Sequence, residues 1–207
     1  DAAITHFIDT GVDVPQLNSI LNMPVAGFVA ERNDGGLIGA RGQIDIVGGP
    51  ALIVSTPEPS TTPINMSFTS LESRASLDGG VQLANASGTF QSKRTEVVDS
   101  QGTAIVVTGA DDAALVADFG QTLIEATIDP ATGDPVLAQG AGVVIQDHDL
   151  GTTSFTTLNI TTTAGHGFQA INGGTVNFAT APIIDATGGA AVDMENTTGD
   201  TNGLAGF

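Results

Sequence analysis

Gly79-Gly80-Val81-Gln82-Leu83-Ala84-Asn85 is the stretch of sequence that decides the fold, because its pattern returns along the chain. A Gly-rich turn is followed by alternating apolar residues and then by another small or polar turn. Period-two alternation between turn residues is typical of a short β-strand with one buried side. The same pattern recurs in Gly102-Thr103-Ala104-Ile105-Val106-Val107-Thr108, Gly140-Ala141-Gly142-Val143-Val144-Ile145-Gln146, Gly165-His166-Gly167-Phe168-Gln169-Ala170-Ile171-Asn172 and Gly188-Gly189-Ala190-Ala191-Val192-Asp193-Met194-Glu195-Asn196.

The spacing of these copies indicates a stacked repeat. Their apolar anchors lie 24, 38, 25 and 24 residues apart, at Val81, Ile105, Val143, Phe168 and Val192. A base step near 24 with one insertion accounts for this series. A repeat of this length, with no long helical pattern between the copies, favours a solenoid in which each coil contacts only its neighbours.

Each repeat contains more than one strand. Gly88-Thr89-Phe90-Gln91 and Gly174-Thr175-Val176-Asn177-Phe178 each follow one copy as a turn and a second strand. Three short strands and three turns in about 24 residues are the proportions of one coil of a parallel β-helix. We therefore predict an all-β fold, a right-handed parallel β-helix with about 24 residues per coil. The hand follows the general preference of parallel crossover connections.

The composition limits both the core and the partners. The 207 residues include 27 Gly and 9 Phe but no Trp, Tyr or Cys, so a thin core is expected and thiol chemistry is excluded. The formal net charge of −18 argues against nucleic-acid binding and against attraction to an anionic membrane. No apolar run is long enough to insert into a bilayer. The acidity favours either solubility in a salty medium or divalent cation binding at the surface.

The repeat divides the chain into two parts. Residues 1–24 fit the pattern poorly and are predicted to form an N-terminal cap or entry segment. Residues 25–207 are predicted to form the parallel β-helix. Within it, the Pro-rich residues 55–63 indicate an exposed loop or a linker between two domains. Residues 110–137 hold the insertion, predicted to be a protruding hairpin or an extra-long turn of one coil.

From Ile64 onward the chain resembles the long right-handed parallel β-helix arrays of bacterial surface proteins. About two thirds of the chain fits this resemblance, which implies a segment of a large adhesin-like or stalk-like protein, secreted or on the cell surface of a prokaryote. The N-terminal segment and the insertion near Asp129 depart from the pattern, and the ending at Gly206-Phe207 indicates a fragment of a longer polypeptide. The residues that carry the resemblance are Met66-Ser67-Phe68-Thr69-Ser70-Leu71-Glu72-Ser73, Gly80 to Phe90, Leu158-Asn159-Ile160-Thr161-Thr162-Thr163, Asn172-Gly173-Gly174-Thr175-Val176-Asn177 and Ile184 to Val192.

Candidate ligand-binding residues are the acids and hydroxyls of the turns. Oxygen-rich turns suit calcium, a hard cation, and the metal candidates are Asp129, Asp134, Asp147 and Asp149. No cofactor other than calcium is expected. The insertion supplies the candidate partner-binding residues Asp111, Asp112 and Thr132.

An enzymatic function would depend on the Asp111-Asp112 pair and on His166. Together with its flanking glycines, His166 resembles part of a polygalacturonase signature, but 54 residues separate it from the Asp pair. That distance is more than two coils, whereas glycoside hydrolysis needs paired carboxylates that flank one bond. The other parts of the signature are absent, so we predict no enzymatic activity. The basic pair Lys93-Arg94 is expected to lie in an exposed turn.

A threonine-rich tract raises a second alternative. Thr152, Thr153, Thr156 and Thr157 precede a further run at 161–163, and ice-binding solenoids carry regular Thr ladders. The Thr residues here show no fixed recurrence in successive coils, so ordinary strand and turn usage is expected.

The sequence as a whole favours a non-enzymatic extracellular structural or adhesive segment of a large surface or filament protein. Expected partners are neighbouring coils or copies of the same protein and cell-surface glycans, without nucleic acid or membrane insertion. The alternatives left open are a carbohydrate-active β-helix, either lyase-like or hydrolase-like, and a glycan-binding module.

Overall fold

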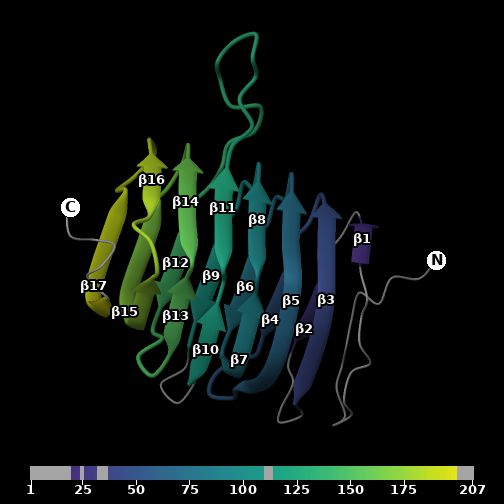
Figure 1. The fold of residues 1–207 in the computed structure, drawn as a ribbon, viewed down its shortest axis with the longest axis vertical. Coiled ribbons are helices and arrows are strands. Elements are labelled where there is room, and N and C mark those ends of the chain that lie inside the picture. The colour runs from purple at the N-terminus through teal and green to yellow at the C-terminus, as the bar shows by residue number, and fades with distance from the viewer. Residues whose placement is uncertain (1–19, 24–25, 32–36, 110–113, 200–207) are drawn as a thin grey trace.

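The computed structural model describes residues 20–23, 26–31, 37–109 and 114–199. The described part contains seventeen strands in one parallel sheet and no helix. The sheet winds into a β-solenoid of about 6 turns, with about 25 residues per turn, which confirms the predicted all-β parallel β-helix. Figure 1 shows the coils stacked side by side, from β1 and β3 at one end to β17 at the other. No helix capable of crossing a membrane occurs in this part of the chain.

Each coil contributes a strand to each of three faces. The first face consists of β2 (Phe28–Glu31), β4 (Leu52–Ser55), β6 (Val81–Ala84), β9 (Ile105–Thr108), β12 (Val143–Gln146) and the first halves of β15 (Phe168–Phe178) and β17 (Val192–Gly199). The second face consists of the first halves of β3 (Ile38–Val47) and β5 (Thr62–Arg74), then β7 (Ala86–Ser92), β10 (Leu115–Asp118), β13 (Thr152–Phe155) and the second halves of β15 and β17. The third face consists of β1 (Ile20–Met23), the second halves of β3 and β5, then β8 (Arg94–Val98), β11 (Gln121–Glu125), β14 (Thr157–Thr162) and β16 (Ile183–Ala186).

The anchors identified in the sequence pair directly on the first face. Val81 pairs with Ile105, Ile105 with Val143, Val143 with Phe168, and Phe168 with Val192. The anchors up to Phe168 are buried, because alternate residues of a strand point to the same side. The residues that recur in the sequence are therefore the residues that pair in register between neighbouring coils.

A stack of phenylalanine rings runs through the core along the solenoid. Consecutive ring centroids lie 6.2, 4.9, 5.5 and 5.8 Å apart. Such separations are typical of favourable aromatic pairs, so each coil contributes to a continuous column. The rings are those of Phe68, Phe90, Phe119, Phe155 and Phe178.

The corner after the first face uses Asn and Asp in a left-handed conformation. Asn85, Asp147, Asn172 and Asn196 have φ angles of 54°, 50°, 50° and 49°. These side chains tolerate positive φ better than other non-glycine residues. The amide of Asn172 donates to Asp147 Oδ1 at 2.9 Å, and the amide of Asn196 donates to Asn172 Oδ1 at 3.2 Å, which links successive coils.

The long step between Ile105 and Val143 contains two regular strands. Within the predicted insertion at 110–137, β10 pairs with β7 and β11 pairs with β8, as ordinary members of the second and third faces. The extra residues therefore lie in the connections before β10 and after β11. Figure 1 shows the second connection projecting beyond the ends of the neighbouring strands. We call this segment, residues 126–142, the protrusion.

Of the Pro-rich residues 55–63, residues 56–61 connect β4 to β5, and the others belong to the two strands. Both strands belong to the same sheet, and the loop lies at the corner between the first and second faces. Thr56 Oγ1 and Thr62 Oγ1 are hydrogen-bonded across the base of this loop, where both residues are buried.

Candidate binding groove

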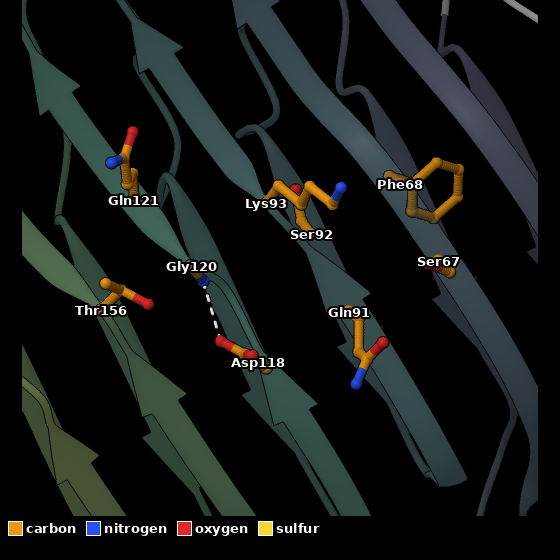
Figure 2. A pocket seen from close by; sticks show the side chains of 9 residues that line it. All are labelled: Ser67, Phe68, Gln91, Ser92, Lys93, Asp118, Gly120, Gln121 and Thr156. Carbon is orange, nitrogen blue, oxygen red and sulfur yellow. Dashed lines mark hydrogen bonds between the residues drawn. The ribbon is translucent and has the colours of Figure 1, made fainter.

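A surface groove lies at the corner between the second and third faces. Its hollow has a volume of about 460 Å³. Figure 2 shows the lining side chains, which come from neighbouring coils rather than from one loop. The lining residues are Ser67, Phe68, Gln91, Ser92, Lys93, Asp118, Gly120, Gln121 and Thr156.

Gly120 allows two coils to pack closely at the groove. This residue connects β10 to β11 with a φ of 56°. A Cβ atom at this position would lie 2.4 Å from the Ser92 carbonyl oxygen and 2.5 Å from that of Lys93. The backbone of one coil thus packs directly against the next, and a residue with a side chain here would push the two coils apart.

The lining of the groove is polar and repeats from coil to coil. Ser67 pairs with Gln91, and Gln91 pairs with Asp118, on three successive strands of the second face. Adjacent strands lie about 4.8 Å apart, so these side chains form a row at that interval. Asp118 Oδ1 accepts the Gly120 N–H at 3.0 Å, shown as the dashed line in Figure 2. Phe68 is buried with the other core rings, so its face is not presented to solvent.

Lys93 is the cation of the groove, and it is exposed. It forms no ion pair with any residue in the described ranges. Arg41, which pairs in register with Ser67 one coil away, is also exposed and without an ion pair in the same part of the chain. The groove therefore has one cation without an ion pair, Lys93, on the coil next to that of the Asp118 carboxylate, and Arg41 lies outside the lining on the coil beyond Ser67.

Arg74 and Arg94 differ from Lys93, because both belong to an ion-pair network on the third face. Arg74 contacts Asp45 at 2.6 Å and also pairs with Glu72, and Arg94 contacts Glu72 at 2.8 Å and also pairs with Glu96. Partial burial works against the charged form of Arg74, but the three carboxylates outweigh it and raise the pKa of Arg74 above its usual value. The exposed turn predicted for Lys93-Arg94 is confirmed for Lys93, which lies between β7 and β8, but is wrong for Arg94, which is the first residue of β8.

The residues predicted in the insertion are only partly described. Asp111 and Asp112 lie outside the described residues. Thr132 lies at the tip of the protrusion, where its hydroxyl accepts the Asp134 N–H at 3.2 Å. Asp129 Oδ1 accepts the Ala131 N–H at 2.8 Å, and Asp129 N–H donates to the Asp134 carbonyl at 2.8 Å. These bonds define a compact turn at the tip.

The candidate calcium ligands fall on two different connections. Asp129 and Asp134 lie in the protrusion after β11, whereas Asp147 and Asp149 lie in the corner after β12. The Asp147 carboxylate accepts hydrogen bonds from Asn172 and from Gln146. Among the described residues, no group of three or more His, Cys, Asp or Glu side chains could hold a metal ion. Calcium binding at either turn stays a prediction.

His148 lies between Asp147 and Asp149 but points into the core, with 1% of its surface exposed. Neither ring nitrogen has a hydrogen-bond partner in the described part of the chain, although the Leu115 backbone lies near enough to favour the protonated ring. Burial lowers the pKa of His148, and Leu115 and the Asp149 charge oppose this only in part. The sequence does not signal this burial, because the inward turn depends on the left-handed residue before it.

The prediction that threonines do not recur in successive coils is wrong at one place on the second face, where Thr152, Thr175 and Thr198 pair in register. Thr89, Val116, Thr152, Thr175 and Thr198 pair in sequence as one outward row. The connections before each strand differ in length, so this row has no constant period in the sequence. Val116, an exposed apolar residue, interrupts this row, so it is not a continuous threonine ladder.

Comparisons of the chain with family models, with curated proteins and with solved structures find no match.

Proposed function

We propose that this chain is a non-enzymatic, extracellular structural or adhesive β-helix segment of a prokaryotic surface or filament protein. The observation that carries the proposal is the unbroken register of the first face. From Phe28 through Leu52 and Val81 to Val192, each anchor pairs with the equivalent residue of the next coil. Such an array is built for length and for lateral surface.

The contacts between coils support a mechanical role. A force along the solenoid must break the parallel strand pairs between two coils together with the contacts of their core residues. The phenylalanine column and the Asn172–Asp147 bond add side-chain contacts across these same junctions. Because each coil contacts only its neighbours, such a segment transmits load through a series of similar interfaces.

The groove supports contact with a ligand more than catalysis. Of its nine lining residues, only Asp118 has a carboxylate, and one of its oxygens is already bound to Gly120. Hydrolysis of a glycosidic bond by the usual route requires two carboxyl groups about 5–10 Å apart on opposite sides of that bond. Amides and hydroxyls from Gln91, Gln121 and Thr156 instead offer hydrogen bonds to sugar hydroxyls. A glycan-binding module is therefore the second candidate function.

The proposal is tested by stretching single molecules of the chain between two handles and by incubating the chain with pectin and alginate. We expect unfolding at high force in successive steps, as coils detach one after another, and no release of reducing or unsaturated sugar ends. Sustained turnover of either polysaccharide would refute the non-enzymatic part. Extension at the low force of an unfolded chain would refute the structural part.

A further inference from the structure

We propose that the groove between the second and third faces binds an acidic polysaccharide that lies along the solenoid axis, with a sugar carboxylate on Lys93. This inference rests on the adhesive form of the proposed function and names its ligand. The binding site consists of Ser67, Gln91, Lys93, Asp118 and Gln121, and Arg41 lies beside it, in register with Ser67.

The charge of the ligand follows from Lys93. The chain has only 5 basic residues against 23 acidic ones. Arg74 and Arg94 are paired with acids on the third face, whereas Lys93 is left uncompensated at the mouth of the hollow. An anion is the partner that an exposed ammonium lacks here, and Figure 2 shows Lys93 among the residues that line the hollow.

The polymeric character of the ligand follows from the row of polar side chains. Ser67, Gln91 and Asp118 recur at the strand spacing of about 4.8 Å along the axis. This interval is close to the length of one pyranose residue in an extended chain, so consecutive sugars meet equivalent positions on consecutive coils. The second oxygen of Asp118 has no hydrogen bond in the described structure and can accept one from a sugar hydroxyl.

The whole-chain charge limits how acidic the ligand can be. A net charge of −18 repels a polymer that has a carboxylate on every sugar. The Debye length is about 8 Å at physiological salt, so the repulsion from distant acids is screened and a single carboxylate can approach Lys93. The ligand that fits best has carboxylates separated by neutral sugars.

The test is isothermal titration of the full chain with three probes of similar length. Hyaluronan octasaccharide has a carboxylate on alternate sugars, oligogalacturonate has one on every sugar, and chitohexaose has none. We expect hyaluronan octasaccharide to bind more tightly than the other two, with an affinity that falls as salt is raised. Lys93→Gln should weaken this binding about fivefold, the upper range for an exposed ion pair, and Lys93→Arg should retain it.

Gln91→Ala, inside the groove, should also weaken binding, and Gln101→Ala is its matched control. Gln101 is equally exposed but lies at the corner between the third and first faces, away from the groove. Equal affinity of the wild type and Lys93→Gln for every probe would overturn the inference, as would no binding of any probe by the wild type. Those results leave the mechanical function standing. Cleavage of a probe would instead refute the proposed non-enzymatic function.

Discussion

The phenylalanine column provides the sharpest test of how the coils hold together. Phe119 is completely buried, and its ring centroid lies 4.9 Å from that of Phe90 and 5.5 Å from that of Phe155. Phe119→Leu keeps most of the apolar volume but removes both ring pairs. Each such pair contributes about 0.5–1.5 kcal/mol beyond the area it buries, so the two together contribute about 1–3 kcal/mol.

Phe28→Leu is the matched control for this substitution. Phe28 is also buried, at 2% exposed, but has no ring contact in the described part of the chain. Both substitutions lose a similar amount of apolar surface, so the difference between them isolates the ring pairs. Phe119→Ala should cost more than either Leu variant, about 3–5 kcal/mol, because it also leaves a cavity.

The assay is urea unfolding followed by far-ultraviolet circular dichroism, since the chain has no Trp or Tyr for fluorescence. Amide hydrogen exchange shows which strands lose stability in each variant. Protection should fall most in β7, β10 and β13, which hold or adjoin the three rings, because a solenoid couples mainly neighbouring coils. If Phe119→Leu and Phe28→Leu lowered the free energy of unfolding equally, the column would contribute nothing beyond ordinary burial, and this reasoning would be wrong.

Two further predictions concern titration and calcium. Burial lowers the pKa of His148 in the folded chain, so the unfolded chain binds more protons between that lowered pKa and the usual value of 6.5, and stability should fall as the pH drops below about 6.5. His148→Leu should remove this part of the pH dependence in urea midpoints measured from pH 7 to about pH 5, and parallel curves for the two proteins would contradict the assignment. Calcium binding at the tip of the protrusion predicts that added calcium raises the unfolding midpoint of the wild type. Combined Asp129→Asn and Asp134→Asn substitutions should abolish that rise, and chelation should reverse it, whereas an equal rise in both proteins would place the calcium elsewhere.

The sequence predicts the first face better than the other two. The anchors from Val81 to Val192 recur at nearly constant steps except across the insertion, so their pairing is readable from spacing alone. The second-face partners Thr89, Val116 and Thr152 are separated by connections of unequal length, so no single period aligns them. The phenylalanine column is hidden in the sequence for the same reason.

The groove could not be predicted, because it depends on backbone packing between coils. Gly120 is part of this packing, and the sequence presents it as one glycine among 27. Its role becomes clear only from the structure, in which the Ser92 and Lys93 carbonyls occupy the space that a Cβ atom at position 120 would need. The inward turn of His148 is likewise set by the φ of 50° at Asp147, which alternation along a strand does not reveal.

Lys93 and Arg94 are neighbours in the chain, yet the corner between two faces gives them opposite roles. Arg94 starts β8 on the third face, where Glu72 and Glu96 on that face are within reach. Lys93 is the last residue before that strand and lines the groove, where the one carboxylate is Asp118. The chain has many acids, yet Lys93 forms an ion pair with none of those described. Its place in the coil fixes the direction of its side chain and keeps it away from the carboxylates of the third face. That separation preserves a positive charge for a ligand, and it explains why a single substitution, Lys93→Gln, is expected to affect binding while leaving the ion-pair network on the third face unchanged.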